Sequence, residues 1–156
     1  MQTFGATVEE QVTQALRYHD FGQEVVIKVV CSPIGLAACV QLRAQGIRVL
    51  MTAVHEAKQT LLAMAADATY VTPYLSEMYR AGRDGRAEVV TMLRILRSGE
   101  ANTRLFMAGL NDVATMVYLA QEGMTQVTLT PDIADQLFAQ QETTAMAAFF
   151  EAASQD

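Results

Sequence analysis

A single lysine inside an apolar strand pattern is the residue of this chain best placed for covalent chemistry. Lys28 lies in Glu24–Val30, where period two puts Val26, Lys28 and Val30 on one face and the remaining apolar residues on the other. Apolar residues on both faces predict a strand covered on both sides, as in a parallel sheet wrapped by helices. Burial disfavours the charged ammonium, and the neutral amine is the form that attacks a carbonyl to give a Schiff base. The alternative is a lysine that extends to water from the strand end or pairs with an acid.

The rest of the chain alternates strand and helix patterns, which predicts parallel βαβ units in one domain over residues 1–156. The predicted strands are Gln2–Gly5 (if another segment pairs with it), Glu24–Val30, Ile47–Thr52, Ala68–Pro73, Arg104–Ala108 and Gln126–Leu129. The predicted helices begin at the Thr7-x-x-Glu10 capping box, at Ser32-Pro33, at Val54 (to Ala65), at Ala87 (to Leu96), after Asn111 or Asp112 (to Leu119), at Thr130-Pro131 and at Thr144 (to Ala153). The polar stretch Ser76–Gly85 is predicted to be a loop. About six strands are too few for a complete (β/α)8 barrel. The pattern therefore predicts most of such a barrel, starting after its first strands.

Composition narrows the classes of function. The net charge is −6 and there is no basic stripe to neutralise phosphates, which argues against nucleic acid as a partner. Cys31 and Cys39 have neither metal-ligand spacing nor a disulfide framework, so we expect a reduced, cytoplasmic protein. The N-terminus does not have a signal-peptide pattern, and no apolar run reaches the ~18 residues of a membrane span, so we expect no membrane partner.

Several segments together resemble the fructose-6-phosphate aldolase branch of the transaldolase family. They are IKV around Lys28, GLAA at Gly35–Ala38, QGIRVLMTAV at Gln45–Val54, LLAMAADATYVTPY at Leu61–Tyr74 and VTLTPDIADQ at Val127–Gln136. The resemblance covers nearly the whole chain. It implies a TIM (β/α)8 barrel that lacks its first two βα units, and a class I aldolase, which uses no metal or other cofactor.

The resemblance assigns catalytic roles to four residues. It makes Lys28 the Schiff-base lysine, whose iminium serves as the electron sink for carbon–carbon bond cleavage or formation. Thr52 resembles the threonine that contacts this lysine and the active-site water. Tyr74 and Gln2 resemble the pair that holds a proton-shuttling water in the aldolases, whereas transaldolases tend to carry phenylalanine and glutamate there. A phenol at the end of a strand is chemically suited to be a general acid or to position water.

The chain departs from the family pattern in three places. The aspartate of the family's first strand, which handles proton transfer, and the asparagine of its second strand have no counterpart here. Glu77 stands where the family has a phosphate-binding arginine, with Arg80 and Arg83 nearby. Ala108 and Gly109 fall on substrate-binding positions, but Gly109 replaces a serine and Asn111 replaces a basic residue. If the Glu77 carboxylate faces the site, we expect poor use of phosphorylated acceptors.

Three functions stay open on this pattern. The first is a fructose-6-phosphate aldolase that acts on small, dihydroxyacetone-like ketones and on aldehydes. The second is a transaldolase that moves a dihydroxyacetone unit between sugar phosphates, in carbohydrate metabolism such as the pentose phosphate pathway. The third is a shortened family member without turnover, acting as a structural or interaction protein, because a barrel lacking two units exposes sheet edges. Family members form rings through the C-terminal helix, so we expect a homo-oligomer in which Thr144–Ala153 packs on a neighbouring subunit.

Overall fold

The computed structural model describes residues 1–99 and 102–154. Its strands are β1 Ile27–Val30, β2 Val49–Val54, β3 Tyr70–Pro73 and β4 Arg104–Leu105. Its helices are α1 Val8–His19, α2 Pro33–Ala44, α3 Lys58–Ala65, α4 Leu75–Arg80, α5 Gly85–Ser98, α6 Val113–Gln121, α7 Pro131–Phe138 and α8 Gln141–Ala153. In the described part of the chain, no helix combines the length and apolar character needed to cross a membrane.

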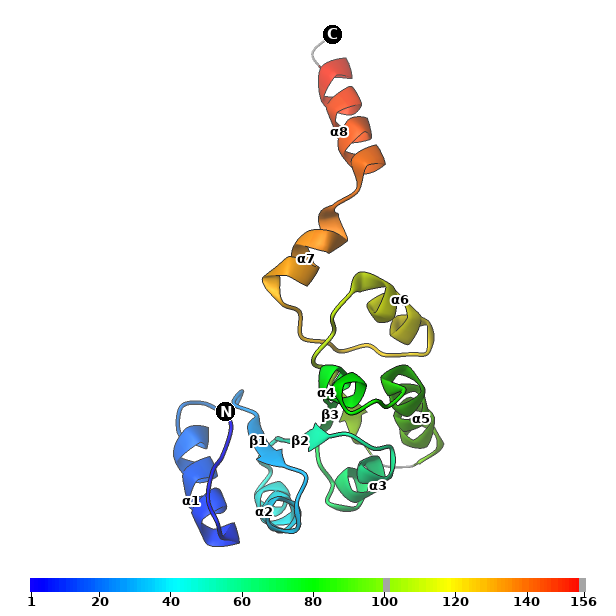
Figure 1. The fold of residues 1–156 in the computed structure, drawn as a ribbon. Coiled ribbons are helices and arrows are strands. Elements are labelled where there is room, and N and C mark those ends of the chain that lie inside the picture. Colours follow the sequence, from blue (N-terminus) through cyan, green and yellow to red (C-terminus); the bar gives the residue numbers. More distant parts are fainter. Residues whose placement is uncertain (100–101, 155–156) are drawn as a thin grey trace.

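The strands form one parallel sheet in the order β1-β2-β3-β4, with helices in the connections between them (Figure 1). The two outermost predicted strands are present in the described residues only as single bridges. At one edge the Lys28 amide donates to the carbonyl of Met1 (2.8 Å), and the amide of Thr3 donates to the carbonyl of Lys28 (2.9 Å). At the other edge Met107 pairs with Val127. The parallel α/β pattern is therefore confirmed, and the sheet is open.

The two faces of this sheet differ in burial. The face against the helices is formed by apolar side chains that are at most 5% exposed: Ile27, Val29, Val49, Met51, Val71 and Leu105. On the opposite face Lys28 is half-buried and Val30 is 41% exposed. The prediction that the Lys28 strand is covered on both sides is therefore wrong. Four strands that do not close on themselves leave this face without the side chains that strands across a barrel would supply.

Local capping explains where several helices begin. Thr7 and Glu10 form the predicted capping box at α1, and Ser32 with Pro33 starts α2 as predicted. The first turn of helix α2 packs against the end of β1. A Cβ on Gly35 would lie 1.9 Å from the carbonyl oxygen of Val30. Only glycine permits this close approach, which ties α2 to the strand that carries Lys28.

Some element boundaries differ from the prediction. The stretch predicted as a loop, Ser76–Gly85, contains most of α4, because Leu75 and Met78 are three residues apart and both bury completely. The helix predicted from Val54 begins only at Lys58, because Val54 still belongs to β2. The last helix begins three residues before the predicted Thr144.

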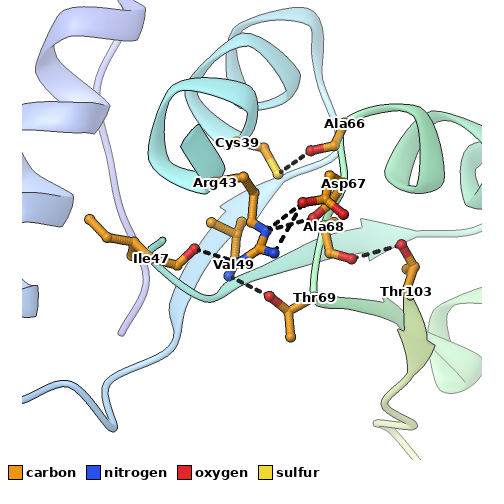
Figure 2. A network of polar contacts seen from close by, with 9 residues as sticks. All are labelled: Cys39, Arg43, Ile47, Val49, Ala66, Asp67, Ala68, Thr69 and Thr103. Carbon is orange, nitrogen blue, oxygen red and sulfur yellow. Dashed lines mark hydrogen bonds and ion pairs between the residues drawn. The ribbon is translucent and has the colours of Figure 1, made fainter. Parts of the chain in front are cut away.

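A polar network holds together the strand ends opposite to Tyr74 (Figure 2). The Arg43 guanidinium donates to the Asp67 carbonyl (2.7 Å), to the Asp67 carboxylate (3.0 Å) and to the Ile47 carbonyl (3.2 Å). Nearby, the Cys39 thiol donates to the Ala66 carbonyl (3.5 Å), and burial raises the pKa of this thiol to about 12. Cys39 is therefore a structural thiol, and the network fixes α2 against the turn that precedes β3.

The C-terminal helix extends away from the rest of the molecule (Figure 1). None of its residues is buried, and its apolar side chains Met146, Phe149 and Phe150 are 52%, 65% and 63% exposed. Apolar side chains this exposed are typical of a helix that packs on a partner.

Candidate active site

Three of the four predicted catalytic residues converge at the carboxyl ends of the strands. The Lys28 amine lies 3.2 Å from the Tyr74 hydroxyl oxygen, and the Thr52 hydroxyl lies 2.9 Å from the same oxygen. Lys28 comes from β1, Thr52 from β2, and Tyr74 directly follows β3. Because the strands are parallel and in register, residues far apart in sequence meet at one edge.

The Tyr74 hydroxyl is the electrostatic centre of this group. Burial alone would raise the pKa of the phenol. Hydrogen bonds from Thr52 and Lys28, together with the positive charge of Lys28, outweigh burial and lower that pKa. A phenol with a lowered pKa gives up its proton more readily, so Tyr74 is suited to proton transfer next to an amine.

Gln2 reaches the site through its backbone only. It pairs with Lys28 in a parallel bridge, and its side-chain amide donates to the carbonyl of Thr3 (2.9 Å). Within residues 1–99 and 102–154, no hydrogen bond joins the Gln2 side chain to Tyr74. The predicted Gln2–Tyr74 pair would therefore need a bridging water or a change of side-chain rotamer.

A cavity of about 290 Å³ opens next to the lysine. It is lined by Lys28, Tyr74, Ser76, Glu77, Arg80, Ala108 and Gly109, and so includes both predicted substrate-binding residues. Gly109 has φ +73, and a Cβ there would lie 3.1 Å from the Ser76 hydroxyl. A left-handed backbone and a close neighbour both favour glycine at this position, so the serine expected from the family would strain the backbone here.

The polar wall of the cavity combines both signs of charge. Glu77 lines the cavity, and its carboxylate forms an ion pair with Arg80, whose side chain is 72% exposed. Arg83 instead pairs with Glu56 (3.0 Å), so it is engaged elsewhere. Of the two arginines named as substitutes for the family's phosphate contact, Arg80 lines the cavity, but Glu77 already neutralises it.

Sequence reasoning missed Ser76 and the position of Asn111. The Ser76 hydroxyl lies 2.7 Å from the carbonyl oxygen of Gly109 and 2.9 Å from the amide oxygen of Asn111, and its one proton serves one of them at a time. Ser76 was missed because the sequence pattern predicts a loop over Ser76–Gly85. Its place two residues after Tyr74 at a strand's carboxyl end was the available signal. Among the described residues, no group of three or more His, Cys, Asp or Glu side chains is arranged to hold a metal ion.

The fold and this cluster define a parallel α/β protein with a lysine–tyrosine–threonine constellation at the carboxyl edge of its sheet. The sequence matches the family described as Transaldolase/Fructose-6-phosphate aldolase over residues 1–156, and the chain belongs to that family. Among curated relatives, a probable transaldolase of Nitrosopumilus maritimus is 32% identical over 127 residues, which are 81% of this chain and 57% of the relative. A probable transaldolase of Anaeromyxobacter dehalogenans is 30% identical over 129 residues, which are 83% of this chain and 59% of that relative.

The chain thus spans less than two thirds of the length of these relatives. Among solved structures, a GMP reductase from Trypanosoma brucei superposes with a TM-score of 0.61 at 15% sequence identity, over 80% of this chain and 31% of that chain. At this identity the similarity concerns the fold alone.

Proposed function

We propose that this chain is a class I aldolase of the fructose-6-phosphate aldolase type, in which Lys28 forms a Schiff base with a dihydroxyacetone-like ketone. The observation that carries the proposal is the Lys28 amine, 3.2 Å from a phenol of lowered pKa and on the wall of a cavity. A nucleophilic amine next to a proton donor is the arrangement that Schiff-base chemistry needs.

The proposed reaction begins when the neutral Lys28 amine attacks the ketone carbonyl and forms a carbinolamine. The Tyr74 phenol, directly or through water, gives a proton to the departing hydroxyl, and water leaves as the iminium forms. The Tyr74 phenolate left by this step, directly or through water, then takes the proton of the hydroxyl on the carbon that departs. The electron pair of the carbon–carbon bond moves to the iminium, which releases an aldehyde and leaves an enamine. Protonation of the enamine and hydrolysis return the ketone and the free amine. In the reverse direction the enamine attacks an aldehyde and forms the bond.

Thr52 has a supporting role in this proposal. The Thr52 hydroxyl lies 2.9 Å from the Tyr74 oxygen, and the residue is only 1% exposed. A buried hydroxyl bonded to the phenol helps to hold it next to Lys28. Gln2 would bind the proton-shuttling water together with Tyr74, a role that its backbone position beside Lys28 supports. Ala108 and Gly109 would contact the substrate through the cavity wall that they form.

The second candidate is a transaldolase, which the names of the curated relatives favour. Gln2 and Tyr74 favour the aldolase instead, since transaldolases tend to carry glutamate and phenylalanine there. The two activities differ in the fate of the three-carbon unit. An aldolase releases free dihydroxyacetone, whereas a transaldolase passes the unit to an acceptor sugar phosphate.

The polar wall of the cavity supports an uncharged aldehyde as acceptor. Glu77 lines the cavity and its carboxylate already pairs with Arg80, so a phosphate entering there meets a negative charge next to the guanidinium that would bind it. We therefore infer that unphosphorylated hydroxyaldehydes are preferred over phosphorylated ones.

The described sheet would correspond to the part of a (β/α)8 barrel that follows its first two βα units. Family membership, the share of the relatives that the chain spans and the open Lys28 face all support this assignment. In such a barrel α8 would pack on a neighbouring subunit, which its exposed Met146, Phe149 and Phe150 support.

The proposal is tested by cleavage of fructose and of fructose 6-phosphate, with dihydroxyacetone, the released aldehydes and the sugar phosphates measured separately; we expect the unphosphorylated substrate to be used better. Release of free dihydroxyacetone that is lost in Lys28→Met and reduced in Tyr74→Phe supports the aldolase. Conversion only when an acceptor sugar phosphate is added supports the transaldolase. No turnover of either substrate, with or without an acceptor sugar phosphate and with the fold intact, would leave the third function, a structural or interaction protein.

A further inference from the structure

Strand β2 contains a bulge next to the candidate site. Met51 pairs with Val71 and Val54 pairs with Pro73, so β2 uses three residues where β3 uses two. The extra residue is Ala53, whose φ of 57° lies in the left-handed region. A left-handed alanine is strained, and bulges of this kind re-aim side chains near functional sites.

The bulge reverses the alternation of side chains after Ala53. Thr52 pairs with Val30 and lies on the Lys28 face of the sheet. Without a bulge, Val54 would share that face with Thr52. Instead Val54 is completely buried in the hydrophobic core. His55 lies against Tyr74, whose hydroxyl contacts the Lys28 amine.

His55 meets the tyrosine of the site there. The ring centroids of His55 and Tyr74 are 5.9 Å apart with an interplanar angle of 76°, an edge-to-face contact. The segment is fixed on both sides: Val54 accepts a hydrogen bond from the Tyr74 amide (2.9 Å), and the Gln59 side-chain oxygen accepts one from the His55 amide (2.8 Å). The His55 ring therefore has a defined place beside the phenol.

We propose that His55 is a positioning residue of the Lys28 site and that the Ala53 bulge places it there. Its ring packs against the Tyr74 ring and keeps the phenol oxygen within reach of both the Lys28 amine and the Thr52 hydroxyl. Without the His55 ring, the Tyr74 side chain has an open flank and can turn away from its two partners. The kinetic part of this inference rests on the proposed function, but the geometric part does not.

The test measures ionisation of the Tyr74 phenol, which needs no turnover. The ultraviolet difference titration between the wild-type protein and Tyr74→Phe isolates this phenol from the other tyrosines, and each His55 or Ala53 variant is titrated against its own Tyr74→Phe double variant. Burial raises the pKa of Tyr74, and the bonds from Thr52 and Lys28 with the Lys28 charge outweigh it. His55→Ala weakens these bonds, and we expect this loss to exceed the smaller effect of reduced burial and to move the Tyr74 ionisation to higher pH. His55→Phe keeps an aromatic ring at the same place, so the Tyr74 phenol of this variant is expected to ionise at the same pH as in the wild type. Ala53→Gly is the matched control, since glycine adopts the left-handed conformation without strain and keeps the bulge.

Two results would overturn the inference: an unchanged Tyr74 ionisation in His55→Ala, or a His55→Phe variant that behaves like His55→Ala. Circular dichroism establishes that each variant is folded before titration. If the chain turns over, His55→Ala should also lower kcat about tenfold with KM within twofold of wild type, and His55→Phe should restore it. A protein without turnover removes only this kinetic readout, so failure of the proposed function is distinguished from failure of the positioning role.

Discussion

The Glu77 carboxylate offers a sharp test of what the cavity accepts. Glu77 is 44% exposed, lines the cavity and neutralises Arg80, which is 72% exposed. Glu77→Gln removes the negative charge and frees the guanidinium. Hydrogen bonds to charged groups contribute ~1.5–3 kcal/mol, and solvent screening at these exposures reduces this to about 1 kcal/mol. We therefore expect Glu77→Gln to lower the KM for a phosphorylated aldehyde about fivefold.

The assay compares glyceraldehyde 3-phosphate with glyceraldehyde as acceptors for dihydroxyacetone at two ionic strengths. The KM for the unphosphorylated aldehyde should stay within about twofold, and the gain for the phosphorylated one should shrink at high salt. Glu24→Gln is the matched control: it makes the same change of charge at an exposed residue that precedes β1, at the opposite end of the strand from the site. A wild-type preference for the phosphorylated aldehyde, or an equal gain in Glu24→Gln, would refute the reasoning.

Two further predictions concern stability. Arg43→Ala should lower the free energy of unfolding by about 2 kcal/mol, because it removes charged hydrogen bonds to Asp67 and Ile47 from a side chain that is only 24% exposed. Arg43→Lys should recover little of this stability, since lysine lacks the planar guanidinium that donates to both partners. Urea unfolding at neutral pH measures both, and a change below about 0.5 kcal/mol would show that the network is unimportant. Asp112→Ala should cost about 1 kcal/mol at neutral pH, because Asp112 caps α6 by accepting from the Thr115 amide (2.6 Å). That hydrogen bond lowers the pKa of the Asp112 carboxyl in the folded protein. The stabilisation it gives is therefore present above the ordinary pKa of aspartate and is lost as pH falls through the lowered pKa of the folded state. A stability difference between wild type and Asp112→Ala that stays constant into acid would contradict this assignment.

Local signals in the sequence predicted much of the fold. The capping box at Thr7 and the Ser32-Pro33 pair place two helices correctly, because capping depends on a few adjacent residues. The convergence of Lys28, Thr52 and Tyr74 also follows from parallel strands in register. Their catalytic roles stay predictions, since these roles rest on the family resemblance and on geometry.

Features that depend on distant contacts could not be read from the sequence. Whether the Lys28 strand is covered on both faces depends on how far the sheet closes, which no local pattern records. Helix α4 was predicted as a loop because its charges and flanking glycines outweighed the spacing of Leu75 and Met78. The bulge that brings His55 to Tyr74 lies at an alanine, a residue that gives no sign of a left-handed backbone.

Schiff-base trapping at Lys28 tests the central claim most directly. The protein is incubated with dihydroxyacetone, reduced with borohydride and digested, and the added mass is located by peptide. The chain contains two lysines, and Lys58, whose side chain is 73% exposed and paired with Glu56, is the internal control. The amine of Met1 needs its own measurement, because burial and the nearby Lys28 charge lower its pKa.

The proposed function predicts an adduct on Lys28 well above that on Lys58 and on the Met1 amine, and its loss in Lys28→Arg. Equal labelling of the three amines, or an adduct yield that Lys28→Arg leaves unchanged, would contradict it.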